Sequence, residues 1–420
     1  MHILMISQWF PPHVSGGSIR TFNAAKGLAL VGHEVTVITP LPPPPFVSRP
    51  EYSGKRNMYW GSINGIRVIR TWSPFLQDLG LARRLILFIC FMVTSLFPLP
   101  FIRHVDVVWA VNPPIFSIFP ALIYKAFSRC ALFRDVPDLW PEAIYDLGLI
   151  KSGIIKPILD FISKVSYLVA DGVTSISAGY LRVLKKQYGL TDDRLHFIEI
   201  GVDTNFLHPY VVESNNSSPY RLNKKFIVMY SGNLGIQYDF STVLEAAKLL
   251  KNYNDIFFVI RGWGVLKNFI QENIKEFNNV LLDTEVVDKQ KICQILNYAD
   301  VFLLPMKPLK AAEMGLPTKL LEYQACGKPV IVCTRGEPAL YIRSTDSGIV
   351  VSPNDPRALS EAILELYRNK EKRERLGENG WKHVSEHLAL KKIGERFSNI
   401  MTPKFQEASK IACVQKLGQV

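Results

Sequence analysis

Residues 2–39 read HILMISQWFPPHVSGGSIRTFNAAKGLALVGHEVTVIT, and this stretch decides the fold class. Residues 2–7 form an apolar run the length of a buried strand, and residues 34–39 form a second one that is rich in β-branched residues. Between them, apolar residues at helical spacing predict a helix over 18–31, which Gly32 ends. A strand, a glycine-containing loop, a helix and a strand predict a βαβ unit, and therefore an α/β fold with a parallel, doubly wound sheet.

The same pattern returns after a polar segment, so the chain divides into two α/β halves. Further strands are predicted at 105–111 and 172–176 in the first half, and at 226–231, 256–260, 301–304 and 330–333 in the second. We expect an N-terminal domain over 1–210, a linker over 211–225, a second domain over 226–380, a helix over 381–401 that packs back on the first domain, and a tail over 402–420. Two doubly wound halves predict a binding crevice at the carboxyl ends of their strands.

Composition and charge exclude several classes of protein. The 420 residues are 48% hydrophobic, which excludes a largely disordered chain. The six cysteines include no C-x-x-C pair, which argues against a disulfide framework and a cysteine zinc site and fits a reducing compartment. The net charge is +12, and residues 1–120 hold ten Lys and Arg against four Asp and Glu. This excess suits phosphate groups or an anionic membrane surface, whereas the lack of a basic helix with interleaved aromatic residues argues against nucleic acid.

Residues 85–102 are uncharged and are flanked by Arg83, Arg84 and Arg103. A single membrane span is rejected, because two prolines interrupt the last turns and a span would divide one sheet across the membrane. Two interpretations remain open. The segment is either a helix buried in the first domain, or a helix or helical hairpin that dips into the cytoplasmic leaflet with the three arginines at the lipid headgroups. Because no secretory signal opens the chain, we expect a cytoplasmic protein that associates peripherally with the inner face of the cell membrane.

Three short motifs carry the candidate chemistry, and the first is a glycine pair. Gly16 and Gly17 lie between the first strand and the first helix, with Arg20 about one turn inside that helix. Glycines let a ligand approach the backbone, and the free N–H groups of a helix N-terminus attract phosphate. The motif predicts a phosphate or acceptor pocket, with a tight turn followed by a surface arginine as the alternative.

The second motif is DVPDLWPE at residues 135–142. Its prolines and tryptophan hold Asp138 and Glu142 in a rigid loop, where an acid can orient an acceptor hydroxyl or act as a base. On the residues alone we favour the other interpretation, in which the acids simply begin a helix that has Pro141 at its first position.

The third motif is EMGLPTKLLEY at residues 313–323. A loop containing glycine and proline leads into a helix near Thr318, which would cap it, and the free N–H groups of that helix can bind a diphosphate. Lys319 adds a positive charge, and Glu322 one turn later can accept two hydrogen bonds from a ribose. Without further context, an ordinary amphipathic helix explains the same residues.

No metal site is predicted. Residues 383–387 match H-x-x-E-H, but no signature of a third ligand accompanies them, and no Asp-x-Asp motif is present to hold a divalent cation. No G-x-G-x-x-G motif follows the first strand, which argues against a dinucleotide-dependent dehydrogenase.

Taken together, the motifs resemble the family 4 glycosyltransferases, which have the GT-B fold of two facing Rossmann-like domains. More narrowly, the chain is similar to the bacterial surface-polysaccharide branch that includes N-acetylfucosaminyl transferases. The resemblance runs from about residue 1 to residue 401. It is carried by 10–12 (FPP), 16–17 (GG) with Arg20, 32–37 (GHEVTV), 112–114 (NPP), 138–142 (DLWPE), 201–203 (GVD), 232–235 (GNLG), 262–264 (GWG) with Lys267, and 317–323 (PTKLLEY).

The resemblance implies transfer of a sugar, an N-acetylated or deoxy hexose, from a nucleotide diphosphate sugar that is UDP-linked. The implied acceptor is a polyprenyl-diphosphate-linked or other lipid-linked glycan, and the implied reaction retains the anomeric configuration and needs no cofactor and no metal. Asp138, on the acceptor side, and Glu322 are the implied catalytic residues. Donor contacts are implied for Gly16, Gly17, Arg20, Gly232, Asn233, Arg261, Lys267, Met314, Gly315, Leu316, Pro317, Thr318, Lys319 and Glu322. Without a metal, preorganised N–H groups and cations must meet the charge of the leaving group.

The chain departs from the family pattern at three positions. Met314 replaces the first of two glutamates, Asn233 replaces an arginine, and Gln237 or Tyr238 lies near the position of a lysine. The candidates for the missing positive charge are Arg261, Lys267 and Lys319. These departures raise a second hypothesis, in which the chain is a nucleotide-sugar-binding partner subunit of a polysaccharide assembly complex without its own turnover.

Overall fold

The computed structural model describes residues 1–13, 15–42, 58–74, 81–146, 148, 150, 153, 155–210, 220, 225–287 and 289–417. The chain forms two compact units: the first is Met1–Gly201 with Leu390–Val420, and the second is Val202–Ala389. The second unit therefore begins before the predicted linker and ends after the predicted domain limit. Of that linker, 211–219 and 221–224 lie outside the described residues, as does most of the proline-rich stretch that follows the second strand.

The first unit is built on a sheet with strand order β3-β4-β2-β1-β5-β6-β7-β8. The strands are β1 (His2–Ile6), β2 (Glu34–Pro40), β3 (Met58–Ile63), β4 (Ile66–Thr71), β5 (Val107–Val111), β6 (Ala131–Val136), β7 (Gly172–Ser175) and β8 (Leu195–Phe197). Because β1 pairs in parallel with both β2 and β5, the predicted parallel α/β sheet is confirmed. Among the described strands of this sheet, only β3 and β4 pair antiparallel, and their hairpin turns at Asn64 and Gly65, which both have positive φ angles.

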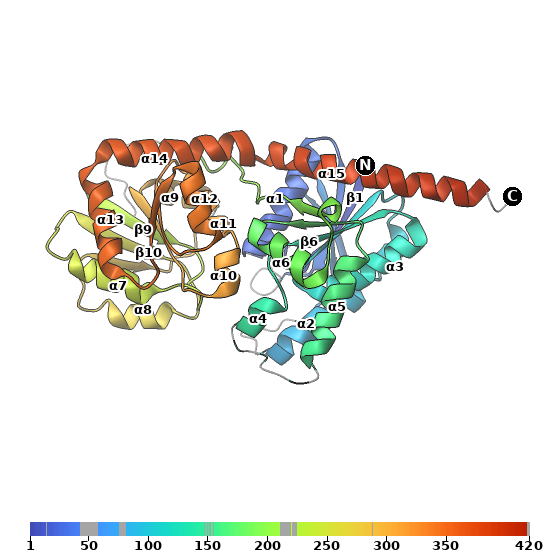
Figure 1. The fold of residues 1–420 in the computed structure, drawn as a ribbon, viewed down its shortest axis with the longest axis horizontal. Helices are drawn as coiled ribbons and strands as arrows, with labels where there is room; N and C mark the ends of the chain where they lie inside the picture. Colours follow the sequence, from blue (N-terminus) through green and yellow to red (C-terminus); the bar gives the residue numbers. More distant parts are fainter. Residues whose placement is uncertain are drawn as a thin grey trace. The chain divides into compact units, whose positions relative to one another are not determined.

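Helices cover the sheet of the first unit (Figure 1). They are α1 (Gly16–Leu30), α2 (Leu81–Thr94), α3 (Ile118–Ser128), α4 (Glu142–Asp146), α5 (Ile155–Leu168), α6 (Ala178–Tyr188) and α15 (Leu390–Leu417), with short 3-10 turns η2 (Leu99–Phe101), η3 (Ile115–Ser117) and η4 (Asp192–Arg194). Helix α1 begins where Ser15 accepts a hydrogen bond from the Ser18 N–H. All five residues of β1 are buried, so the core lies against the centre of the sheet.

The second unit has a wholly parallel sheet with strand order β11-β10-β9-β12-β13-β14. Its strands are β9 (Phe226–Ser231), β10 (Ile256–Arg261), β11 (Val280–Asp283), β12 (Val301–Pro305), β13 (Val330–Cys333) and β14 (Gly348–Val351). Its helices are α7 (Phe240–Leu249), α8 (Lys267–Asn273), α9 (Lys289–Asn297), α10 (Lys310–Met314), α11 (Thr318–Ala325), α12 (Glu337–Thr345), α13 (Pro356–Arg368) and α14 (Lys370–His383), followed by a π-helical turn η5 (Val384–Leu388).

The last helix, α15, returns to the first unit and packs against α1. The two helices approach closely at glycines, because a Cβ atom added to Gly394 would lie 2.1 Å from the carbonyl oxygen of Gly27. Phe397 packs its ring against Trp109 at 5.2 Å, and Arg396 donates to the Glu199 carboxylate at 2.6 Å. Helix α15 runs to Leu417, where the sequence predicts a tail from residue 402.

Candidate active site

Two glycine loops of the second unit lie backbone against backbone at the carboxyl ends of β9 and β10. A Cβ atom on Gly262 would lie 1.8 Å from the carbonyl oxygen of Gly232, and both residues have φ angles that favour glycine, 142° and 146°. The N–H of Leu234 donates to the carbonyl of Trp263 at 2.8 Å, which fixes the two loops together. This part of the second unit therefore needs glycine at both positions.

Helix α11 is tied to the end of β9 through one side chain. The hydroxyl of Tyr323 accepts a hydrogen bond from the Ser231 N–H at 2.9 Å and donates to the Ser231 carbonyl at 2.7 Å. The Tyr323 ring also stacks on Phe302 of β12, with 4.0 Å between ring centroids. The predicted cap by Thr318 is wrong, because Thr318 is the first helical residue and Pro317 precedes it without a side-chain cap. Tyr323 thus holds α11 against the end of β9, next to Gly232.

Lys319 lies between this loop and two aromatic rings. Its Nζ donates to the Tyr230 hydroxyl at 2.6 Å and lies 4.1 Å from the ring centroid of Tyr238. A Cβ atom added to Gly232 would come within 2.8 Å of the Lys319 Cε. Burial lowers the pKa of Lys319 to about 7, although the nearby charge of Glu322 acts in the opposite direction. An anion bound here would restore the full charge of the ammonium group.

The loop that joins α10 to α11 contains Met314 and the residues up to Pro317. Leu316 is buried in the unit, whereas Met314 is half-buried at the end of α10. The backbone of this region is pressed against the turn after β13, because a Cβ atom on Gly336 would lie 2.0 Å from the carbonyl oxygen of Glu313. Glu322 is half-buried on α11, three residues after Lys319. The third sequence motif therefore gathers beside the two glycine loops.

Two arginines that we expected to contact the donor have structural roles instead. Arg261 is buried, forms an ion pair with Asp283, and donates to the Glu285 carbonyl at 2.6 Å. Arg20 is 1% exposed and pairs with Asp135, with 3.0 Å between Nη2 and Oδ1. Because both guanidinium groups are bound by buried partners, we expect Arg20 and Arg261 to hold each unit together rather than to contact the donor.

Lys267 and Asn233 remain at the surface near the glycine loops. The Lys267 Nζ lies 3.9 Å from the Trp263 ring centroid, and the Trp263 indole N–H donates to the carbonyl of Thr284. Asn233 is exposed, and its carbonyl accepts a hydrogen bond from the Tyr230 hydroxyl. The structure therefore brings these two predicted residues to the same group of loops as Lys319.

In the first unit, the glycine pair begins α1 after the end of β1. A Cβ atom on Gly17 would lie 3.3 Å from Cδ1 of Trp9, so Gly17 is packed tightly while Gly16 is exposed. The ring of Trp9 lies 4.5 Å from that of His13, whose Nδ1 is buried without a hydrogen-bond partner among the described residues. His13 is not among the residues predicted from the sequence, although its place between two prolines and the glycine pair was a usable signal.

Asp138 follows β6 and has its side chain exposed to solvent. Within the part of the chain that the structure describes, its carboxylate has no hydrogen-bond or ion-pair partner. The surrounding protein nevertheless desolvates the carboxyl group and raises the pKa of Asp138 to about 6. An accessible carboxylate with a raised pKa is suited to accept a proton near neutral pH.

The loop around Asp138 is held from behind by a buried polar network. Asn112 donates to the Trp140 carbonyl at 3.3 Å and itself accepts a hydrogen bond from Arg134 at 3.3 Å. Arg134 is fully buried and donates at 2.5 Å to the Ser117 hydroxyl as well. We did not anticipate Arg134, because the sequence shows only a charged residue in a strand and not the carbonyl groups that surround it.

Glu142 is placed differently from Asp138. One of its carboxylate oxygens accepts a hydrogen bond from the Tyr188 hydroxyl, and the other is buried without a partner among the described residues. Burial raises the pKa of Glu142. Asp138 is thus the accessible acid of this motif, and Glu142 is the one that holds the loop to α6.

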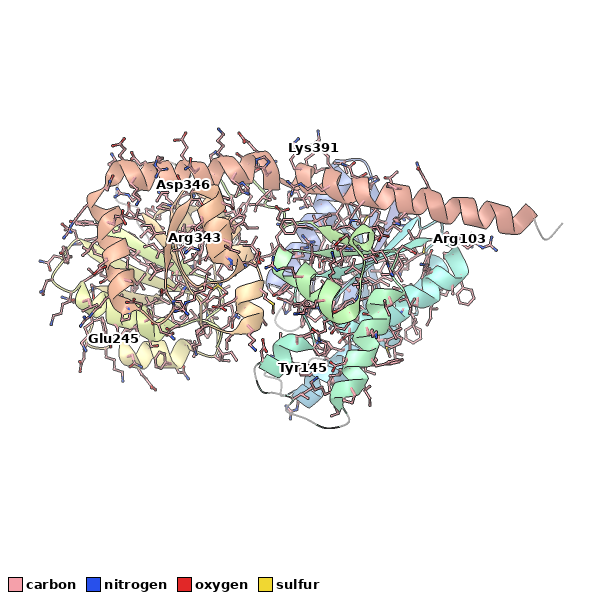
Figure 2. All side chains as sticks on the ribbon, in the orientation of Figure 1. Arg103, Tyr145, Glu245, Arg343, Asp346 and Lys391 are labelled. Atoms are coloured by element: carbon pink, nitrogen blue, oxygen red, sulfur yellow. The ribbon has the colours of Figure 1, made fainter. Side chains whose placement is uncertain are left out.

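The three arginines predicted at a membrane, Arg83, Arg84 and Arg103, are all exposed, and Figure 2 labels Arg103. Among the described residues, no group of three or more His, Cys, Asp and Glu side chains is arranged to hold a metal ion.

Two family models match the chain in succession. The model described as Glycosyltransferase Family 4 matches residues 14–206, and the model described as Glycosyl transferases group 1 matches residues 213–383. The two matches lie one after the other and leave only short stretches of the chain unmatched.

Curated relatives are similar over part or most of the chain. A GDP-mannose-dependent monoacylated alpha-(1-6)-phosphatidylinositol monomannoside mannosyltransferase of Corynebacterium glutamicum is 25% identical, over 55% of this chain and 62% of its own length. The putative colanic acid biosynthesis glycosyl transferase WcaI of Escherichia coli is 24% identical, over 86% and 91%. An N,N'-diacetylbacillosaminyl-diphospho-undecaprenol alpha-1,3-N-acetylgalactosaminyltransferase of Campylobacter jejuni is 24% identical, over 63% and 68%.

Solved structures share the fold over nearly the whole chain. Sucrose-phosphate synthase from Thermosynechococcus elongatus aligns with a TM-score of 0.73 at 16% identity, over 97% of this chain and 99% of that one. HepE of Anabaena, in complex with UDP, aligns with a TM-score of 0.69 at 14% identity, over 96% and 100%. At these identities the likeness shows the fold alone.

Proposed function

Because the chain belongs to the glycosyltransferases and has the GT-B fold, we propose that it moves a sugar from a nucleotide diphosphate sugar to a lipid-linked glycan acceptor in surface polysaccharide synthesis. The finer features of the proposal are a UDP-linked donor carrying an N-acetylated or deoxy hexose, retention of the anomeric configuration, and transfer without a metal. The acceptor class is supported by the Campylobacter relative, whose name describes a sugar carried on diphospho-undecaprenol.

The observation that carries the proposal is the arrangement around Lys319. On one side of Lys319, Gly232 and Gly262 have no side chains, so a ligand could approach their backbone. On the other side, the N-terminus of α11 supplies N–H groups. A diphosphate bound there would be met by N–H dipoles and one ammonium group. Glu322, one turn further along α11, would accept hydrogen bonds from the ribose hydroxyls.

Asp138 is the group that we assign to the acceptor. In the reaction, the bond between the anomeric carbon and the diphosphate breaks with its electron pair on the leaving group, and a bond to the acceptor oxygen forms. The acceptor hydroxyl must lose its proton, and an unpaired carboxylate is suited to orient that hydroxyl or to take the proton. Its raised pKa matches that task at neutral pH. The crevice predicted between the two halves stays a prediction.

The proposed acceptor is carried by lipid, so we also propose that the protein works at the cytoplasmic face of the cell membrane as a peripheral protein. The segment Arg83–Phe101 has a mean hydropathy of 1.9 and is 33% buried. By length and composition alone it could cross a membrane, but its helix α2 ends at Thr94 and one face of it lies in the core of the first unit. Peripheral contact fits these facts better than a span.

The alternative function is a partner subunit that binds a nucleotide sugar without turnover. Met314, Asn233 and Gln237 favour it, because each stands where the family resemblance implies a charged residue. The ion pair of Arg261 with Asp283 also supports this alternative, because it occupies one candidate for the missing charge. Lys267 and Lys319 remain as cations beside the loops.

The deciding experiment incubates the protein with a panel of radiolabelled nucleotide sugars and polyprenyl-diphosphate-linked acceptors. We expect transfer with one donor, and loss of transfer in Glu322→Ala while the protein stays folded. Donor binding by the wild-type protein without transfer to any acceptor would favour the partner subunit. Absence of both transfer and nucleotide binding would count against both functions.

A further inference from the structure

Large apolar side chains are exposed along three helices of the first unit, and α2 is the first of them. Ile86, Ile89 and Val93 are 52%, 45% and 45% exposed, and their spacing of three and four residues places them on one face of the helix. Phe88 and Phe91 lie on the opposite face and are buried. Helix α2 is therefore apolar on its exposed face as well as on its buried face, which a surface helix that faces only water would not require.

The exposed stripe continues beyond the end of α2. Phe97 and Phe101 are 64% and 69% exposed in the turns that follow the helix. Phe97 also lines a pocket with Trp72, Met58, Thr71 and Thr94, whose surface is mostly apolar. The indole of Trp72 is itself 45% exposed, and tryptophan is enriched where protein meets the headgroup region of a bilayer.

Helices α3 and α5 repeat the pattern. On α3, Phe119, Ile123 and Phe127 recur every four residues, and Phe127 is 86% exposed. On α5, Phe161 is 67% exposed. The neighbouring exposed positions of α5 are Ile155, Ile158 and Leu168. An exposed apolar stripe on one surface helix is unremarkable, but stripes on three helices of one unit mark an interaction surface.

The three helices are packed together, so their stripes belong to one side of the unit. Phe88 of α2, Ile115 of η3 and Leu159 of α5 lie in one buried cluster, and α2 and α3 are in direct contact. Tyr145 of α4, labelled in Figure 2, donates to Asp160 of α5 at 2.8 Å. In Figure 1 the three helices lie on one side of the sheet, while α1 and α15 lie on the other.

Charge identifies the occupant of this surface. Residues 81–130, which include α2 and α3 but not α5, carry five cations and a single acid, Asp106, which accepts a hydrogen bond from the N–H of His2 at 2.7 Å. The exposed cations are Arg83, Arg84, Arg103 and Arg129. Apolar side chains bordered by arginines match a membrane surface. The apolar side chains would lie among the acyl chains, and the arginines would bind the anionic headgroups.

The geometry points to a single docking face made by α2, α3 and α5 together, whose partner is a bilayer that contains anionic lipid. This inference rests on the proposed function for the need to reach a lipid-linked acceptor, but it names the surface that makes the contact. It differs from insertion of residues 85–102 alone, because α3 and α5 supply part of the apolar area.

The docking face is connected to the loop that carries Asp138 by the buried cluster that contains Phe88 and Leu159. Trp140, two residues after Asp138, belongs to that cluster, and its ring packs edge-on against Phe88 at 6.0 Å. A bilayer seated on the three helices would therefore hold the Asp138 loop at a fixed height above the headgroups. That is where the hydroxyl groups of a lipid-linked sugar lie.

Flotation with liposomes tests the face. The purified protein is mixed with vesicles of phosphatidylcholine alone or with phosphatidylglycerol added. The double variant Phe127→Glu with Phe161→Glu changes only residues outside 85–102. We expect the wild-type protein to float with the anionic vesicles, and the double variant to lose at least about tenfold in binding. The matched control is Leu340→Glu, since Leu340 is 53% exposed on α12 of the second unit, and this variant should float like the wild type.

Three results would overturn the inference. The double variant could bind as well as the wild type, the wild type could bind neither kind of vesicle, or the wild type could form a dimer in solution that the double variant abolishes. Circular dichroism melting confirms that each variant is folded. Binding of UDP by the same preparations is measured in parallel, so that failure of the docking face is distinguished from failure of the proposed donor site.

Discussion

The Lys319 ammonium donates to the hydroxyl of Tyr230 at 2.6 Å, and that hydroxyl in turn donates to the backbone carbonyl of Asn233. The chain of hydrogen bonds connects the start of α11 to the loop after β9. The Tyr230 hydroxyl is a neutral partner, so it does little to offset the loss of water around the ammonium group. Desolvation therefore lowers the pKa of Lys319 to about 7.

Donor binding should take up a proton at Lys319. Above pH 7 the amine is largely neutral in the free protein, and a bound diphosphate raises its pKa by favouring the charged form. Donor affinity should therefore fall as the pH rises from about 7 to 9. Calorimetric titration at pH 8 in buffers of different ionisation enthalpy measures the uptake. Lys319→Met should bind the donor at least about tenfold more weakly and show no uptake. Equal uptake by the variant would contradict the assignment.

Asp138→Asn should lower kcat by about 10²- to 10⁴-fold with little change in donor KM, as expected for loss of a general base. A base must be deprotonated to act, so wild-type kcat/KM should rise with pH through about 6, the pKa of Asp138. That limb of the pH profile should vanish in the variant. Glu142→Gln is the comparison, because Glu142 is bound to Tyr188 and should leave the limb in place. A limb that persists in Asp138→Asn would assign it to another group.

Gly262→Ala should destabilise the second unit by about 3 kcal/mol or more, because the new methyl group meets the carbonyl of Gly232 in a φ region that favours glycine. Gly65→Ala is the matched control, since Gly65 also has a positive φ angle but has open space around its Cβ position. Its cost should be about 1–2 kcal/mol, from backbone strain alone. Urea unfolding gives both values, and equal losses would mean that the contact between the loops is unimportant.

Arg20→Met should destabilise the first unit by about 3–5 kcal/mol, because it leaves the Asp135 carboxylate buried without its ion-pair partner. Below the unfolding transition, the donor affinity of the variant should match that of the wild-type protein. Arg67→Ala removes an exposed ion pair with Glu34 and should cost no more than about 1 kcal/mol. A large loss of donor affinity in folded Arg20→Met would restore the ligand contact that the motif first suggested.

The strands were predictable from the sequence wherever they are buried and apolar. β1 and β9 are nearly continuous apolar runs and β2 is rich in β-branched residues, and parallel pairing follows from the helices between them. The β3–β4 hairpin was not anticipated, although Asn64-Gly65 between two apolar runs is a strong local turn signal. The extent of α15 was also missed, because charged residues and Pro403 interrupt its apolar pattern.

The candidate site was predictable where one motif supplies several neighbours, as around Lys319. The surroundings of that lysine were not, since Tyr230 and Tyr238 come from another strand and loop. The surroundings of the arginines were the hardest to predict. Arg20 and Asp135 are 115 residues apart in the sequence, so nothing local distinguishes a guanidinium buried in an ion pair from one that faces a ligand.

The contact of Gly27 with Gly394 has a consequence for how the protein is made. One helix of the first unit is supplied by residues that leave the ribosome only after the whole second unit has been translated. Until then the face of α1 that carries Gly27 has no helix packed on it, and the first unit cannot complete its fold. Translation that stops before residue 390 would therefore release a second unit with all of its residues and a first unit that lacks a helix. The first unit would then be the one bound by chaperones or degraded by proteases.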